Sequence, residues 1–304
     1  METQEKQEKA EKQEEKEREL TAKTAAMGKQ RKKQTAIVMY GEDIPYTIEK
    51  IDSLSPAEKR YNWEISFGLQ VVDDLCPSEY MIALSEDNIS GAKSYLEISD
   101  EIEKYHSGNR VSEEEREADL VSLRIAGILP ENAFVFSPVA LKGIHRNLFA
   151  GVLSIDIPPG EYRQYNISKQ ERVLAGKSVS YSPYYLIKDT LAFDFGNEKD
   201  FDYSALSKEE KAHHIMKFIS SIWQIHPFGE GNTRTCAVFA VLYLRSLGFQ
   251  IDNTPFHKHS KYFRDALALD NFPENRRPEY LKMFTDNLLL AGRYDLAPEI
   301  PAIE

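Results

Sequence analysis

The feature that most constrains the fold is a helix that carries apolar residues on nearly every side. Residues 233–248 have helical character, and the run 236–244 within them is almost wholly apolar. Because such a helix has no face suited to water, other elements must surround it in the core. Gly248 is expected to end it. The sequence therefore predicts a layer of partner elements packed around one buried helix.

A second helix is expected directly before the buried one. Ser207 and Glu210 form a capping box, and the apolar residues that follow recur three or four apart until about Ile225. The short loop between the two helices, residues 226–232, contains two glycines. A polar loop that leads onto the first turn of a buried helix is typical of a functional site.

Helical patterns also account for most of the remaining chain. Ser55 and Pro56 mark the start of a small helical unit over 55–105, and further helices are predicted at 113–129, at 138–149 and from 184 onward. Residues 155–183 differ, because they hold a Pro-Pro-Gly turn and an alternating stretch at 177–181 that favours a β-hairpin. Residues 35–40 could form one strand. The predicted fold class is mainly α with a small β-hairpin.

Composition excludes some classes of protein. The 304 residues carry 38 Lys and Arg against 49 Asp and Glu, a net charge of -11. Residues 1–33 hold ten basic and eight acidic residues and form a charged tail, so the remaining 271 residues carry 28 minus 41, or -13. This balance argues against wrapping of duplex nucleic acid. We expect no membrane partner, because no apolar run is long enough to span a bilayer.

The cysteines and the N-terminus bear on the compartment. Two cysteines, Cys76 and Cys236, do not make a disulfide scaffold, and Cys236 is interpreted as a packing residue of the buried helix. No secretory signal is visible at the charged N-terminus. We therefore expect a cytoplasmic protein.

The loop residues suggest chemistry on a nucleotide phosphate. A helix N-terminus binds anions, and Gly229 and Gly231 allow the backbone to approach one closely. Arg234 lies in the first turn, where its charge is unfavourable unless a phosphate receives it. Glu230 would repel that phosphate unless Mg²⁺ lies between them. Asn232 can donate to a phosphate oxygen.

His226, at the start of the same loop, can accept a proton near neutral pH. Taken together, these residues are suited to attack on a Mg²⁺-bound nucleotide phosphate.

The run His-Pro-Phe-Gly-Glu-Gly-Asn-Thr-Arg at 226–234 resembles the signature of the Fic family, His-x-Phe-x-(Asp/Glu)-Gly-Asn-x-Arg. Residues 141–149 and 160–163 resemble the helix and turn that precede the family's flap hairpin, and 262–267 resemble a helix beside the nucleotide base. The resemblance covers roughly 110–290 and implies a Fic-type helical core with a small β-hairpin flap. It also implies an adenylyltransferase, which moves AMP from ATP to a Ser, Thr or Tyr hydroxyl of a target protein and releases pyrophosphate.

The resemblance assigns roles residue by residue. His226 would be the catalytic base, Glu230 the Mg²⁺ ligand and Arg234 the ligand of the β-phosphate. The resemblance thus implies ATP as substrate and Mg²⁺ as cofactor. The other residues assigned to the nucleotide site are Phe228, which anchors the loop, and Gly229, Gly231, Asn232, Thr233 and Tyr262. The flap residues that would dock the target by strand addition are Lys177, Ser178, Val179, Ser180 and Tyr181.

Two departures from the family pattern bear on function. Thr233 stands where the family often has a glycine, and Ala237 stands where it often has a second arginine, which meets the terminal phosphate. The Ser/Thr-x-x-x-Glu-Gly/Asn motif of autoinhibited members has no full match, since Lys104 follows the nearest candidate at 99–103. The helical unit before residue 109 still resembles a fused antitoxin-like segment.

Several interpretations stay open. The leading one is a protein adenylyltransferase that acts on a hydroxyl-bearing target protein, including itself. Two others are a nucleotide-binding regulatory module without transfer activity, and a Fic enzyme that removes AMP or transfers another phosphate-linked group. For Lys177 and Tyr181, a role as plain surface residues is as good an interpretation as target docking. His213, His214, His257 and His259 are interpreted as surface histidines.

These patterns predict the segment boundaries. They identify neither the target protein nor the oligomeric state. We predict four segments: a charged low-complexity tail at 1–34, a helical and regulatory unit at 35–108, a Fic domain at 109–292, and a C-terminal tail at 293–304.

Overall fold

A computed structural model describes residues 54–130, 134–153, 157–297 and 299–303, and residues 54–304 form one compact unit. The predicted tail at 1–34 and the strand at 35–40 lie outside the described residues. Helices dominate the described chain, and the α-helices are α2 Pro56–Gln70, α3 Glu79–Ser90, α4 Tyr95–Gly108, α5 Glu113–Ile128, α6 Pro138–Phe149, α7 Ile187–Lys199, α8 Lys208–Ile225, α9 Asn232–Ser246, α10 Thr254–Lys258, α11 Ser260–Asp270 and α12 Glu279–Leu289. Short 3₁₀ turns are η1 Val71–Asp73, η2 Arg172–Leu174 and η3 Tyr184–Leu186.

Local capping explains where several helices begin. Ser55, Ser94 and Ser207 each accept from the backbone N–H three residues on, and a glutamate at that position reaches back to the cap. These capping boxes satisfy N–H groups that the first helical turn leaves unpaired. The predicted starts of α2 and α8 are confirmed, as is the predicted helix at 138–149.

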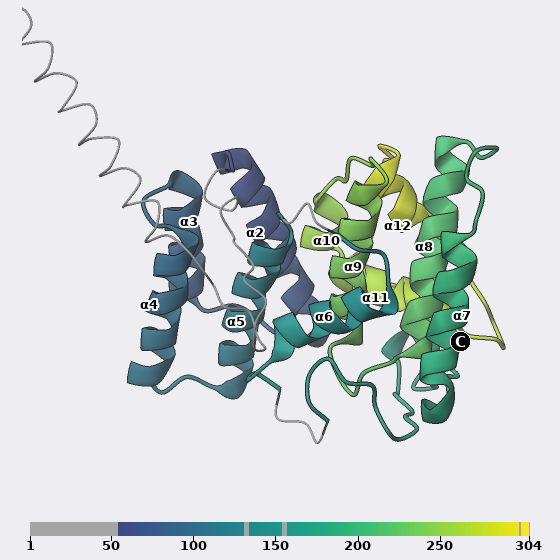
Figure 1. The fold of residues 1–304 in the computed structure, drawn as a ribbon, viewed down its shortest axis with the longest axis horizontal. Helices are drawn as coiled ribbons and strands as arrows, with labels where there is room; N and C mark the ends of the chain where they lie inside the picture. The colour runs from purple at the N-terminus through teal and green to yellow at the C-terminus, as the bar shows by residue number, and fades with distance from the viewer. Residues whose placement is uncertain (1–53, 131–133, 154–156, 298, 304) are drawn as a thin grey trace, which may run out of the picture. The chain divides into compact units, whose positions relative to one another are not determined.

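The buried helix of the sequence pattern is α9. It packs against α2, α6 and α8, and every side chain from Asn232 to Leu244 is buried. Figure 1 shows α9 with α8 on one side and α6 and α2 on the other. The side chains of Val238, Phe239 and Ala240 are wholly inaccessible to solvent. The prediction of a helix surrounded by partner elements is confirmed, and the fold is mainly α.

The first helix of the described chain, α2, packs directly on the C-terminal helices. A Cβ built on Gly68 would lie 2.4 Å from Phe256 O of α10, so only glycine permits this approach. Ser260 Oγ at the start of α11 donates to Gly68 O at 2.6 Å. Helix α2 also packs along α5. This packing brings η1, at the end of α2, against α11.

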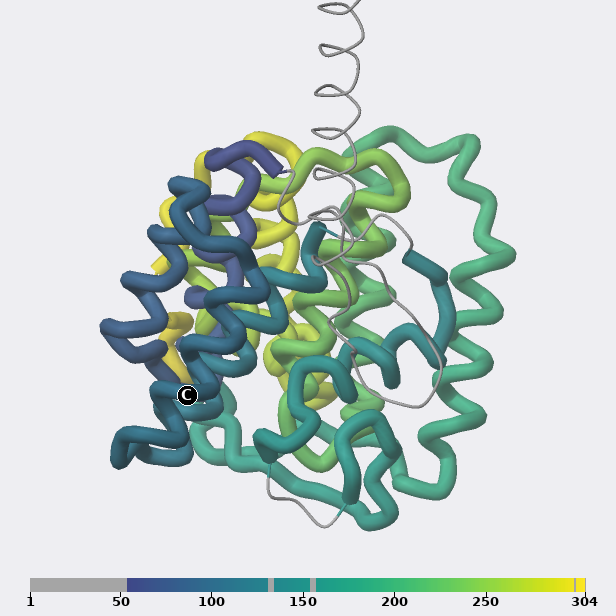
Figure 2. Tube along the Cα trace, turned by 60° about the vertical axis from the view of Figure 1, so that its left-hand side comes forward, coloured from purple at the N-terminus to yellow at the C-terminus, as the bar shows by residue number. Residues whose placement is uncertain are grey.

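The predicted β-hairpin is not present, since the described residues contain no strand. Residues 157–183 follow an irregular path between α6 and α7, along the lower edge of the teal-to-green chain in Figure 1 and Figure 2. Across the turn, Glu171 N–H donates to Lys177 O, but the next pairing joins Lys169 N–H to the hydroxyl of Ser178. A β-ladder needs repeated hydrogen bonds between backbone N–H and C=O groups. In the second pair the Ser178 hydroxyl takes the place of a backbone carbonyl, so no ladder forms. The turn itself is the 3₁₀ element η2.

None of the described helices is long and apolar enough to cross a membrane.

Candidate active site

The loop between α8 and α9 is held in one conformation by its own groups. His226 ends α8 with a left-handed φ of 54°, and its N–H donates to Trp223 O at 3.0 Å. The side chain of Asn232 accepts from Phe228 N–H at 3.0 Å and donates to Phe228 O at 2.9 Å. Asn232 therefore braces the loop, and one hydrogen of its amide remains for a ligand.

Gly231 places the first turn of α9 so that it faces the loop. Its φ is 74°, and a Cβ at this position would lie 2.4 Å from Phe149 Cε2. No side chain caps α9. The first-turn N–H groups and the positive end of the helix dipole are therefore suited to an anion, as the sequence pattern indicates.

Arg163, which the sequence analysis did not assign to the site, holds the start of the loop between α8 and α9 in place. The side chain is 1% exposed, and its guanidinium donates to four backbone carbonyls. Nε donates to His226 O at 2.8 Å, Nη1 to Tyr165 O at 2.6 Å, and Nη2 to both Ile225 O and Ser182 O. One buried arginine thus joins the end of α8 to the segment before α7.

The geometry of His226 makes it suitable as a base. Its Nδ1 lies 3.2 Å from Trp223 O, and a carbonyl can only accept, so Nδ1 carries the proton and Nε2 has the free lone pair. Nε2 is buried and has no hydrogen-bond partner among the described residues. Burial, and then the nearby charges of Lys169, Arg163 and Arg264, lower the pKa of His226 well below its ordinary value. The imidazole is therefore neutral near pH 7 and able to accept a proton at Nε2.

A second histidine supports the loop without facing a ligand. His145 Nδ1 accepts from Gly160 N–H at 2.8 Å, and Nε2 lies 3.0 Å from Glu230 O. Its ring stacks on Phe228 with centroids 3.8 Å apart. Burial lowers the pKa of His145 to about 4. Phe228, which is 1% exposed, is therefore a packing residue of the loop.

Glu230, the predicted metal ligand, is half exposed and paired with a lysine. Lys169 Nζ lies 3.0 Å from both carboxylate oxygens. The carboxylate therefore already pairs with one cation. A half-exposed carboxylate also fits Mg²⁺ held mainly by the phosphates of a nucleotide.

Arg234 points into a pocket of acidic groups from the N-terminal helices. Its guanidinium is 2% exposed, and Nη2 donates to Glu117 Oε1 of α5 at 2.6 Å. Nε lies 2.8 Å from Asp73 Oδ2 of η1, an ion pair outside hydrogen-bond geometry. Nη1 donates to Gln70 Oε1 at 3.2 Å. The arginine predicted to bind phosphate is therefore held by carboxylates in this structure.

Residues 169–181, here named the lid segment, cover the histidine. The ring of Tyr181 packs on the imidazole of His226, with centroids 4.4 Å apart. Its hydroxyl donates to Glu171 Oε1 at 3.0 Å, within the same segment. Together with the Lys169–Glu230 pair, these contacts close the segment over the loop.

The other predicted residues lie in varied surroundings. Thr233 accepts from Trp223 Nε1 at 2.9 Å and so ties α9 to α8. Gly229 is partly buried. Val179 is buried, and Ser180 is exposed beside it. Lys177 points away to pair with Glu274 at 3.0 Å. Tyr262 is 3% exposed and stacks on Phe284, so its ring is a packing residue of α11.

The structure adds Arg163, Lys169, Asp73 and Glu117 to the loop that the sequence identified. Arg163 and Lys169 lie about 60 residues before their partners, and Asp73 and Glu117 lie more than 100 residues before Arg234. A spacing motif cannot contain such pairs. The sequence offers no separate signal for Arg163, because the same turn-rich segment also contains Glu161, Lys169 and Arg172.

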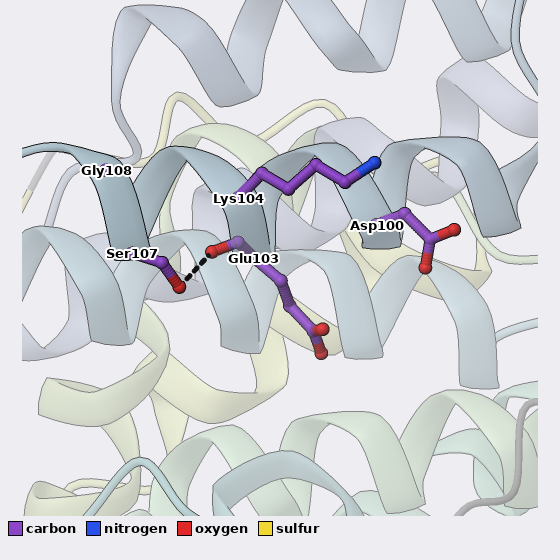
Figure 3. Close-up of a pocket in the computed structure, with 5 residues that line it drawn as sticks. All are labelled: Asp100, Glu103, Lys104, Ser107 and Gly108. Carbon is purple, nitrogen blue, oxygen red and sulfur yellow. Dashed lines mark hydrogen bonds between the residues drawn. The ribbon is translucent and has the colours of Figure 1, made fainter.

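Two features elsewhere are separate from this site. Glu209, His213 and Asp286 place ligand atoms within 4.8 Å of one another, but Lys282 Nζ already lies 3.4 Å and 3.0 Å from the two carboxylates. Figure 3 shows five residues of α4 that line a pocket, Asp100, Glu103, Lys104, Ser107 and Gly108. None of these five residues belongs to the predicted site.

Comparison with known proteins agrees with the motif. Residues 135–244 match the model of the Fic/DOC family. Two solved structures are similar: the N-terminal Fic domain of a putative cell filamentation protein, a VirB-translocated Bep effector, from Bartonella quintana, and the BepC effector from Bartonella tribocorum with bound AMPPNP. The first has 21% identity and a TM-score of 0.45, and the match covers 58% of this chain and 81% of that one.

The second structure has 19% identity and a TM-score of 0.46, and the match covers 57% of this chain and 85% of that one. None of the curated proteins matches the sequence.

Proposed function

The chain contains a Fic/DOC family domain, formed by residues 135–244, and from this premise we propose that it is a protein adenylyltransferase. The proposed reaction moves AMP from ATP to a Ser, Thr or Tyr hydroxyl of a target protein. The observation that carries the proposal is the lone pair of His226 Nε2, which is fixed by the Nδ1 contact to Trp223 O, in the loop that leads into the uncapped N-terminus of α9.

In the proposed transfer step, each residue of the site has a separate role. The target hydroxyl oxygen attacks the α-phosphorus, and its proton passes to His226 Nε2. The new O–P bond forms as the bond from the α-phosphorus to the bridging oxygen breaks, and pyrophosphate leaves. The first-turn amides of α9 and the side chain of Arg234 receive the phosphate charge. Acceleration then comes from positioning and from charge neutralisation.

Glu230 would hold Mg²⁺ together with the nucleotide. When bound, the ion supplies positive charge to the phosphate oxygens. Lys169 pairs with the same carboxylate and would have to release it. We therefore propose that Mg²⁺ and the nucleotide bind together and not one without the other.

The proposal is tested with ATP labelled at the α-phosphate. The wild-type chain is incubated with Mg²⁺ and a lysate, beside His226→Ala and the matched control His257→Ala, whose side chain is 36% exposed. We expect protein-bound label with the wild type and with His257→Ala, and none with His226→Ala. Mass spectrometry of the labelled target should find one added adenylyl group. Equal labelling by His226→Ala would overturn the role of His226.

A second candidate, a nucleotide-binding regulatory module, is favoured by one observation. Arg234 is paired with two carboxylates, and Tyr181 covers His226. If this arrangement persists with nucleotide bound, the chain would bind ATP without transfer. Calorimetry separates the two functions, since tight ATP binding without labelling in any lysate supports the module.

A further inference from the structure

Two arginines from different helices share one carboxylate beside the loop. Asp73 Oδ2 lies 2.8 Å from Arg234 Nε of α9, and Asp73 Oδ1 lies 3.5 Å from Arg264 Nη1 of α11. Each oxygen of the aspartate therefore faces one guanidinium. A phosphate group can offer two oxygens to two guanidiniums in the same way.

Arg264 also belongs to the surroundings of His226. Its Nη2 lies 3.3 Å from Glu171 Oε2, and the other oxygen of Glu171 accepts from the Tyr181 hydroxyl. The positive charge of Arg264 contributes to the lowered pKa of His226. The guanidinium thus lies within electrostatic range of the proposed base, although it is 30 residues from Arg234 in the chain.

The space near Arg264 can admit a phosphate group that replaces carboxylates as the partner of basic side chains. A cavity of about 210 Å³ is lined by Arg264, Lys261 and Arg172 together with the carboxylates that pair with them, Glu171, Asp74 and Asp265, and with Glu299. On α9, one turn beyond Arg234, Ala237 is buried and has no charge to offer. A second cation near Arg234 therefore has to come from another helix.

We propose that Arg264 is the second guanidinium that binds the phosphate chain of the nucleotide, with Asp73 holding both arginines until phosphate replaces it. The inference rests on the proposed function and deepens it, because it assigns recognition of the β- and γ-phosphates to a residue outside the loop. A nucleoside triphosphate or diphosphate would use Arg264, and a monophosphate would not.

The test compares the binding of ATP, ADP and AMP by calorimetry in the presence of Mg²⁺. In Arg264→Gln we expect ATP and ADP to bind roughly 10- to 100-fold more weakly, as for a lost charged hydrogen bond, with AMP within twofold. The control Arg60→Gln removes the same charge from an exposed pair with Glu86 and should change none of the three affinities. Equal losses for ATP and AMP, or no loss, would overturn the assignment.

A second variant guards against a general effect on folding. Asp73→Asn removes the competing charge and should tighten ATP binding several-fold. This gain should be largely absent when Arg264→Gln is also present, since the arginine that benefits is gone. A gain of the same size in both backgrounds would refute the shared role of Asp73.

Measuring target labelling as well as nucleotide binding separates the proposed transfer function from the proposed role of Arg264. If the wild type labels targets and Arg264→Gln binds ATP normally, only the assignment of Arg264 fails. If the wild type binds ATP with the expected dependence on Arg264 but labels nothing, the transfer function fails and the binding role stands. If the wild type binds none of the three nucleotides, both are wrong.

Discussion

Tyr181 keeps the proposed base inaccessible, and removing its ring should expose His226 to a chemical reagent. Diethyl pyrocarbonate modifies unprotonated imidazole nitrogens, and Nε2 of His226 is unprotonated but buried. Modification therefore requires that the lid segment open. The change to test is Tyr181→Ala, with Tyr181→Phe as a partial variant.

The cost of opening follows from three contacts. The hydroxyl of Tyr181 donates to the carboxylate of Glu171, a charged hydrogen bond that contributes about 1.5–3 kcal/mol. Its ring contact with His226 contributes about 0.5–1.5 kcal/mol. The Lys169–Glu230 pair is partly exposed and contributes about 0–1 kcal/mol. Opening then costs about 2–5.5 kcal/mol, so the open form is a fraction of roughly 1 in 30 to 1 in 10,000.

The assay is peptide mass spectrometry of the modified chain, with the rate at His226 divided by the rate at the more exposed His257. Tyr181→Phe loses only the hydroxyl bond and should react roughly 10- to 100-fold faster at His226. Tyr181→Ala also loses the ring contact and should react roughly 30- to 1000-fold faster. Ser180→Ala alters an exposed side chain of the same segment and should react like the wild type.

Two outcomes would contradict this account of Tyr181. Reaction of wild-type His226 as fast as His257 would mean that the imidazole is not covered in solution. Alternatively, Tyr181→Ala could leave the ratio unchanged, in which case another group excludes the reagent.

Three further predictions concern stability, and urea denaturation monitored by circular dichroism checks each. Gly231→Ala should cost about 2–4 kcal/mol, because its Cβ meets an aromatic ring and its backbone is left-handed, whereas Gly143→Ala, with open space, should not destabilise. Lowering the pH from 7.5 to 5 should cost about 2 kcal/mol through His145, since its folded pKa is about 4 and the unfolded chain takes up the proton first, and His226, whose pKa is also lowered, adds to the loss. His145→Gln with the same pH slope as the wild type would contradict this. Arg163→Met should cost about 3–5 kcal/mol because several buried carbonyls lose their donor, and the half-exposed Arg146→Met should cost less than about 1 kcal/mol; equal losses would show that burial of Arg163 does not matter.

Local signals in the sequence predicted most of the helices. The capping boxes at Ser55 and Ser207 depend on residues three apart, so the sequence alone contains both partners. The buried character of α9 was equally visible, because an apolar residue on every side leaves one arrangement open. The segment boundary at 108/109 stays a prediction.

The hairpin prediction was wrong for a reason that alternation cannot detect. Residues 177–181 do alternate, with Val179 buried between more exposed neighbours. Whether such a stretch pairs as a strand depends on its partner, and here the partner offers one backbone contact before Ser178 substitutes its hydroxyl. Tertiary contacts of Arg163 and Tyr181 then fix the path of the segment.

In the candidate site, the loop could be predicted and its charge partners could not. His226, Glu230 and Arg234 fall within nine residues, so their spacing is informative. The carboxylates that hold Arg234 come from η1 and α5, and only the packing of α2 on α5 and α9 brings them there. The prediction of an anion site at Arg234 was therefore incomplete, because carboxylates of the protein already supply negative charge to this arginine.

The close fit at Gly68 has a consequence for dissecting the protein. The backbone of α2 touches the backbone of α10, and Ser260 donates to the same glycine. A fragment that starts at residue 109 would therefore lose Asp73 and the helix α2, which packs against its core. We expect such a fragment to aggregate when expressed alone, and co-expression of residues 54–108 as a separate chain to restore its solubility. Helix α2 thus belongs to the minimal folding unit, whatever its part in regulation.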